Sequence, residues 1–216
     1  DSNYADGFIF LSLVDDPRIR KAFSKLRIPA VVIGNVQVHD EVDTIKVSAG
    51  AVELGLTYLV DKYGGDVLFL NGPTSTIPGR NREKGFLEAM KNRGIDGAKH
   101  VVEAESFDVE AGLVALRTIK NISKYRSIIC ANDLLAAAAL RHLSTLKIEV
   151  PKKIAVIGID NTDLANVLNP SLTSIDYRSE YRGELAAQFI LDRLEDPKTT
   201  YRKVNIAPEL IERESA

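Results

Sequence analysis

Polar side chains with complementary hydrogen-bonding chemistry follow three apolar runs of this 216-residue sequence. Arg82 comes after the first of these runs, at 67–70, Asn132 after the second, at 127–130, and Asp160 after the third, at 154–157. A carboxylate accepts hydrogen bonds from hydroxyls, an amide both donates and accepts, and a guanidinium donates through a planar fork. Together these groups suit a neutral or weakly anionic polyhydroxylated ligand or a nucleobase. Phe107, just before a predicted helix, adds an apolar or stacking face.

Each of these residues also has a purely structural interpretation. Asn132 and Asp133 are good helix N-cap residues, and Asp160 with the asparagine after it could form a turn that opens the next helix. Arg82 could pair with neighbouring glutamates on a helix surface, and Phe107 could be a core residue. Their shared position after successive apolar runs favours the ligand-binding interpretation.

The elements that must position these residues alternate along the chain. Short apolar runs such as 7–11, 30–33 and 127–130 predict strands that are buried on both faces. Segments with helical spacing lie between most of them, so the pattern predicts an α/β fold with doubly wound parallel sheets. In such sheets a ligand binds outside the carboxyl ends of the strands, which is where the polar residues stand.

Composition and charge restrict the function classes. Lys and Arg number 28 against 30 Asp and Glu, which gives a net charge of −2 and no electrostatic reason to bind DNA or an anionic membrane. No apolar run approaches the about 18 residues that span a bilayer, and no secretory leader opens the sequence, so we expect a cytoplasmic protein without a membrane partner. The one cysteine, Cys130, lies in an apolar run and is expected in the core.

Enzyme and metal motifs are scarce. The sequence contains no G-x-G-x-x-G, P-loop, G-x-S-x-G or H-E-x-x-H pattern, so we expect neither catalysis nor a cofactor. Its histidines, His39, His100 and His142, are far apart, and we expect no metal site. The alanine-rich segment 134–140 predicts a helix that is apolar nearly all round, which suits burial on one side and a second layer or a subunit on the other.

Six phrases in register along the chain resemble the effector-binding core of the lactose-repressor (LacI/GalR) family of transcription regulators. They cover essentially the whole sequence and are Ile28-Pro-Ala-Val-Val-Ile33, Arg82-Glu-Lys-Gly-Phe86, Ala131-Asn-Asp-Leu-Leu-Ala136, Val156-Ile-Gly-Ile-Asp-Asn161, Pro170-Ser-Leu-Thr173 and Pro208-Glu-Leu-Ile-Glu-Arg213.

The resemblance implies a type I periplasmic-binding-protein-like fold of two lobes, with a sugar or a purine-like effector between them. By motif position Arg82, Asn132 and Asp160 would bond the ligand and Phe107 would stack on it. Tyr177, near the cleft hinge, would be a further ligand-binding residue. The resemblance also implies a homodimer, with an interface that includes three residues of the helix after Asn132. These are Ala137, Leu140 and Arg141.

This sequence departs from the family pattern in three places, one of which is Val47-Ser-Ala49, where the family usually has Val-Asp-Asn. Gly34-Asn35 stands where the family commonly has an aspartate, which removes one carboxylate. The chain also begins at what resembles the third strand of the first lobe. We therefore expect the first lobe to be N-terminally incomplete, and DNA binding to require an N-terminal helix-turn-helix that this sequence does not contain.

The connectors predict how the chain is divided between the lobes. The first lobe is expected over 1–34 and 178–196, the second over 45–160 and 203–212, and crossover hinge segments over 35–44, 161–177 and 197–202. The favoured hypothesis is an effector-binding and dimerisation domain of a sugar-responsive regulator that acts by ligand-dependent lobe closure. A solute-binding protein of a sugar transporter and an α/β enzyme on a small polyol or nucleoside are the alternatives.

Overall fold

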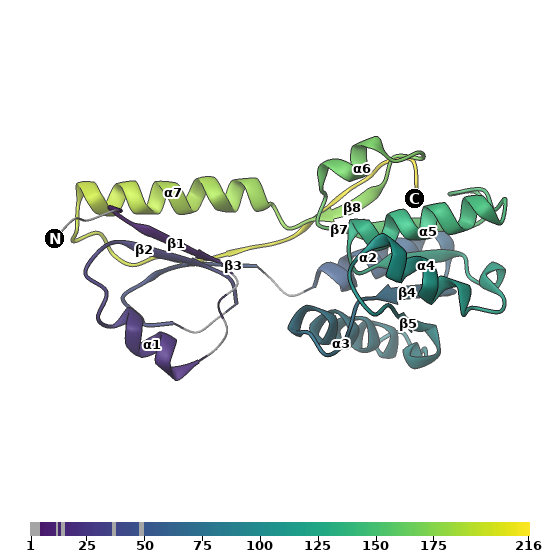
Figure 1. The fold of residues 1–216 in the computed structure, drawn as a ribbon, viewed down its shortest axis with the longest axis horizontal. Coiled ribbons are helices and arrows are strands. Elements are labelled where there is room, and N and C mark those ends of the chain that lie inside the picture. The colour runs from purple at the N-terminus through teal and green to yellow at the C-terminus, as the bar shows by residue number, and fades with distance from the viewer. Residues whose placement is uncertain (1–4, 12, 14–15, 36–37, 48–49) are drawn as a thin grey trace. The chain divides into compact units, whose positions relative to one another are not determined.

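The computed structural model describes residues 5–11, 13, 16–35, 38–47 and 50–216. The chain forms two compact units, each of them an α/β body (Figure 1). The first unit comprises Asp1–Ser48 and Arg178–Ala207, and the second comprises Ala49–Tyr177 and Pro208–Ala216. Within the described ranges, no helix combines the length and apolar character needed to cross a bilayer.

The first unit is built on a four-stranded parallel sheet. Its strand order is β1-β2-β3-β9, so the last strand of the sheet comes from a distant part of the sequence. The elements of this unit are β1 (Phe8–Leu11), α1 (Pro17–Phe23), β2 (Ala30–Ile33), β3 (Asp43–Val47), α7 (Ser179–Glu195) and β9 (Lys203–Ile206).

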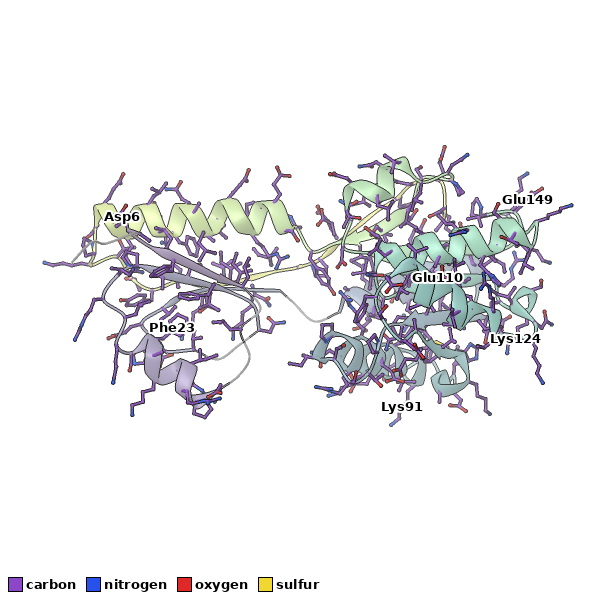
Figure 2. The ribbon with its side chains drawn as sticks, viewed as in Figure 1. Asp6, Phe23, Lys91, Glu110, Lys124 and Glu149 are labelled. Carbon is purple, nitrogen blue, oxygen red and sulfur yellow. The ribbon has the colours of Figure 1, made fainter. Side chains whose placement is uncertain are left out.

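The two helices of this unit cover opposite faces of its sheet (Figure 1). Side chains alternate along β2, so Val31 packs in a cluster with Phe189 of α7, whereas Val32 packs with Phe23 of α1. Figure 2 labels Phe23 on α1. Asp16 accepts a hydrogen bond from Arg18 N at 2.7 Å and so caps α1, whose first helical residue is a proline. This helix ends at Phe23.

A buried ion pair joins α7 and the start of β9 to β3. Asp43 is 1% exposed, and its Oδ2 accepts hydrogen bonds from Arg193 Nε at 3.0 Å and Nη2 at 2.8 Å. Its Oδ1 accepts from the backbone nitrogen of Arg202 at 2.7 Å. Because a buried carboxylate is costly without partners, this network fixes where the chain returns to the first sheet.

The second unit contains a six-stranded sheet in the order β10-β8-β7-β6-β4-β5, parallel except for the antiparallel edge strand β10. Its elements are α2 (Ala51–Tyr63), β4 (Val67–Asn71), α3 (Ile77–Lys91), β5 (Val101–Glu103), α4 (Val109–Arg117), β6 (Ser127–Cys130), α5 (Asp133–Thr145), β7 (Ala155–Ile159), α6 (Asp163–Val167), β8 (Thr173–Asp176) and β10 (Glu209–Ile211), with short 3₁₀ turns at Gly97–His100 and Ile122–Lys124.

Helices cover both faces of this sheet. On one face α2 packs on isoleucine side chains of β6, β7 and β8, and Phe69 of β4 stacks on Phe86 of α3 with 4.9 Å between ring centroids. On the other face α5 begins over Gly158 of β7 and packs along α4. Charged residues lie at the surface, such as the exposed Lys91 and Glu149 labelled in Figure 2. The predicted parallel α/β architecture is confirmed.

The structure corrects the predicted division of the chain. Strands β3 and β9, expected in the second lobe, pair with each other in the first sheet, with Ile45 opposite Val204. Their apolar side chains pack beneath α7, which explains why they belong there. Residues 161–177, expected to cross between lobes, form α6 and β8 of the second unit, and 197–202 lie in the first. Strand β10, inside the predicted tail strand 203–212, joins the second sheet.

Candidate functional site

The five predicted ligand residues all lie in the second unit, at or near the carboxyl ends of its parallel strands. Phe107 follows β5, Asn132 follows β6, Asp160 follows β7 and Tyr177 follows β8. Arg82 lies on α3, the helix that follows β4. The topology therefore gathers residues spread over almost one hundred positions of the sequence at one edge of one sheet.

Arg82 is the centre of this cluster. Its Nη2 lies 3.3 Å from Oδ1 of Asp160, and its guanidinium carbon lies 5.8 Å from the ring centroid of Phe107 and 6.0 Å from that of Tyr177. The Arg82 side chain is 16% exposed and that of Asp160 is 38% exposed, so both groups retain access to solvent. Arg82 does not form the surface pair with glutamates of its own helix that the structural interpretation allowed.

The start of α3, which sets the position of Arg82, is held at two points. Thr76 Oγ1 accepts a hydrogen bond from Gly79 N at 3.1 Å and caps the helix. Asn71, the last residue of β4, donates from Nδ2 to the carbonyl oxygen of Gly79 at 3.0 Å. The helix that carries the guanidinium is thereby attached directly to the sheet.

Phe107 is fixed by close packing and by its backbone. Its ring lies against Gly72, and a Cβ atom at that glycine would be 2.3 Å from Phe107 Cε1. Its carbonyl oxygen accepts a hydrogen bond from Asn132 Nδ2 at 2.9 Å. Asp108 caps α4, and the N–H of Ala111, with a smaller effect of the Ser106 hydroxyl, lowers the pKa of its carboxyl. The half-buried ring therefore has a defined place beside Arg82.

Asn132 carries the structural role that its sequence position allowed. Its Oδ1 accepts a hydrogen bond from Leu135 N at 2.8 Å, which caps α5. Because Nδ2 donates one hydrogen to Phe107, at most one amide hydrogen is left for a ligand. A contact between Asn132 and the ligand thus stays a prediction, and it is limited to one hydrogen bond donated by Nδ2.

Asp160 lies on a loop with an uncommon backbone conformation. Its φ is 107° and that of Asn161 is 48°, both in the region that residues with a Cβ atom seldom adopt. Asn161 donates from Nδ2 to Asp176 Oδ2 at 3.1 Å and accepts at Oδ1 from Arg213 Nη2 at 2.8 Å. Backbone strain of this kind persists only where surrounding contacts hold it, and it is concentrated at functional sites.

The predicted dimer residues of α5 differ in exposure. Arg141 is exposed and Ala137 is half-buried, but Leu140 is only 6% exposed and packs in the core of its own unit. Leu134, one turn before Ala137 on the same side of the helix, is 42% exposed. The outer stripe of α5 therefore consists of Leu134, Ala137 and Arg141, and Leu140 contributes little surface to it.

Gly72 is a part of the site that sequence reasoning missed. A single glycine after a strand is only a poor phosphate cradle, and the position of the Phe107 ring against it is not visible in the sequence.

A pocket of about 260 Å³ lies in the first unit, and none of the predicted ligand residues lines it. Its wall includes Arg193, whose guanidinium is already bonded to Asp43.

Comparison with known proteins shows to which family the chain belongs. Residues 58–216 match the model of the periplasmic binding protein-like domain. The chain is 30% identical over 165 residues to the ribose operon repressor of Escherichia coli strain K12, which covers 76% of this chain and 50% of that protein. It is 33% identical over 160 residues to the transcriptional repressor PurR of Photorhabdus laumondii, covering 73% of this chain and 47% of that protein.

A solved structure shows the same fold. The LacI family transcriptional regulator of Enterococcus faecalis V583 with bound ribose superposes with a TM-score of 0.78 at 22% identity, covering 99% of this chain and 78% of that one. The chain spans about half the length of the curated relatives it matches. It belongs to the periplasmic binding protein-like domain family, is homologous to the ribose operon repressor and PurR, and shares the fold of LacI-family regulators.

Proposed function

We propose that this chain is the effector-binding domain of a DNA-binding transcription regulator and that its effector is a small sugar. The observation that carries the proposal is the convergence of Arg82, Asp160 and Phe107 at the carboxyl edge of the second sheet. The ribose operon repressor, whose name refers to a sugar, aligns with 76% of this chain at 30% identity. In this proposal a helix-turn-helix outside these 216 residues contacts the DNA.

The chemistry of the cluster suits a polyhydroxylated ring. The Asp160 carboxylate accepts hydrogen bonds from hydroxyl groups, the Arg82 fork donates to ring or hydroxyl oxygens, and the Phe107 face packs on C–H groups. Arg82 and Asp160 neutralise each other, so the pair does not require a charged ligand. A purine-like effector, which the resemblance to the LacI/GalR family also implies, is the second candidate.

The proposed signal is a shift between open and closed arrangements of the two units. The polypeptide passes from one unit to the other three times, which permits a hinge of several strands. An effector that binds one arrangement more tightly by a few kcal/mol shifts the population toward it. That shift would reach DNA through a homodimer.

The proposed dimer face is the outer stripe of α5 with its apolar neighbours. Leu134 is 42% exposed, Val114 of α4 is 52% exposed and Val167 of α6 is 77% exposed. Both α4 and α6 contact α5. Apolar side chains exposed on adjoining helices suit burial against a second copy of the same surface.

Calorimetric titration of the chain with D-ribose, D-glucose and hypoxanthine tests the effector proposal. We expect one sugar to bind, and Asp160→Ala to lose about 2–4 kcal/mol of that binding because ligand hydroxyls are left without an acceptor. Lys84→Ala, on an exposed side chain of α3, is the control and should bind like the wild type. Binding of hypoxanthine alone would favour the purine candidate, and release of a chemically altered sugar would favour an enzyme.

A further inference from the structure

We infer that Asp133 is the positioning residue that holds Asp160 in its ligand-binding place. In the sequence, Asp133 follows the apolar run 127–130 and is a candidate both for the ligand edge and for a helix cap. The inference rests on the proposed function, because it takes Asp160 as a ligand-binding residue. It adds a buried residue that acts on the ligand through the loop that carries Asp160.

The carboxylate of Asp133 is buried and bonds to the loop after β7 and to β8. Asp133 is 1% exposed. Its Oδ2 accepts hydrogen bonds from Thr162 N at 2.7 Å and Thr162 Oγ1 at 2.9 Å. Its Oδ1 accepts from Ser174 Oγ at 2.6 Å. One carboxylate therefore joins the start of α5 both to the loop after β7 and to β8.

Helix capping does not account for this carboxylate. The side chain that accepts the capping hydrogen bond at the start of α5 is Asn132, through Leu135 N. The Asp133 side chain instead bonds to Thr162, in the loop after β7, and to Ser174 of β8. The Asp133 carboxylate thus serves to hold Thr162 and Ser174.

The loop that carries Asp160 needs such a support. Asp160 and Asn161 both have positive φ, which is unfavourable for residues with a Cβ atom. Ser174 Oγ accepts a hydrogen bond from Asn161 N at 3.1 Å while it donates to Asp133. Asp133 therefore holds the residue after Asn161 directly and Asn161 itself through one hydroxyl.

The Asp133 carboxylate packs so closely on Gly158 that a side chain at this position would collide with it. A Cβ atom at Gly158, in β7, would lie 2.3 Å from Asp133 Oδ1 and 2.9 Å from a methyl carbon of Leu172. The carboxylate lies directly on β7, which ends at Ile159, one residue before Asp160. With the loop held in this way, Asp160 Oδ1 lies within reach of Arg82 Nη2.

The test is a double-mutant cycle with D-ribose as the calorimetric probe. We expect Asp133→Asn to weaken D-ribose binding about tenfold or more, because an amide cannot accept all three hydrogen bonds. In an Asp160→Ala background the same substitution should change the affinity by less than about twofold. Equal losses in both backgrounds would show that Asp133 does not act through Asp160 and would overturn the inference.

A second pair of variants separates positioning from general stability. Ser174→Ala removes the relay to Asn161 and should weaken D-ribose binding. Ser215→Ala is the matched control, because its buried hydroxyl also bridges strands of this sheet, accepting from Thr173 N at 2.8 Å and donating to Val156 O at 2.6 Å. Equal weakening by the two variants would overturn the inference, and it can be measured even if Asp133→Asn fails to fold.

A measurement without any sugar keeps the inference separate from the proposed function. Amide hydrogen exchange at Asn161 and Thr162 should accelerate in Ser174→Ala and Asp133→Asn and stay unchanged in Ser215→Ala. If the wild type does not bind D-ribose but the exchange accelerates as expected, the choice of sugar is wrong and the support of the loop stands. Unchanged exchange in both loop variants would overturn the role of Asp133.

Discussion

The ring of Phe107 lies on the backbone of Gly72, at a distance that leaves no space for a Cβ atom. That atom would lie between 2.3 and 2.6 Å from three ring carbons of Phe107. The glycine after β4 therefore fixes the ring after β5, and the ring in turn lies 5.8 Å from the guanidinium carbon of Arg82.

Gly72→Ala is expected to displace the Phe107 ring. Overpacking of this kind costs about 1–3 kcal/mol of folding stability, and effector affinity should fall because the stacking face moves. Urea denaturation and calorimetric titration with the bound sugar measure the two effects. Gly85→Ala is the control, since its Cβ atom would make an ordinary 3.9 Å contact with Val52 and should stabilise α3 by about 0.5–1 kcal/mol. Unchanged affinity in Gly72→Ala would remove Phe107 from the site.

Arg82→Lys should weaken effector binding by about 1.5–3 kcal/mol, the scale of a hydrogen bond to a charged group. A lysine is a point charge and cannot present a planar fork to Asp160 and the ligand together. Arg80→Lys offers the same substitution on the same helix, where Arg80 Nη1 donates to the carbonyl oxygens of Thr74 and Ser75. Calorimetry should find wild-type affinity for the Arg80 variant, and equal affinity in both variants would argue against a bidentate role for Arg82.

Ala137→Glu should convert a dimer into a monomer. It places a charge in the middle of the proposed apolar face, between Leu134 and Arg141, where association would have to desolvate it. Sedimentation velocity measures the state of assembly, with Ala22→Glu on the exposed side of α1 as the matched control. A variant that sediments like the wild type would show that this stripe of α5 is not the dimer face.

Cys130 should be unreactive in the folded protein. Burial, and secondarily the negative charge of Asp133, raises the pKa of its thiol well above the usual value, so the thiolate is disfavoured throughout the neutral range. Ellman's reagent at about pH 8 should label nothing in the native state and one thiol per chain after unfolding in guanidinium. Rapid labelling of the folded chain would contradict the buried position.

The sequence was sufficient for the parts of the fold that depend on local patterns. The apolar runs at Val67–Leu70 and Ser127–Cys130 predict strands that the structure contains, and the residues after them mark the correct edge of the sheet. The capping ability of Asn132 is likewise a local property.

The remainder depends on contacts between distant residues. The membership of β9 in the first sheet is fixed by β3 and Asp43, which lie about 160 positions earlier. The alanine-rich α5 carries apolar side chains nearly all round, so its sequence does not show that Leu140 faces inward. The roles of Gly72 and Asp133 appear only when their neighbours in space are known.

Mapping of backbone amide shifts during a titration tests the central claim most directly. If the chain is a sugar-binding effector domain, D-ribose or D-glucose should produce its largest ¹H–¹⁵N shift changes at Arg82, Phe107, Asn132, Asp160 and Tyr177. Changes centred instead on the first-unit pocket near Phe23 and Tyr201, with those five amides unmoved, would contradict the account.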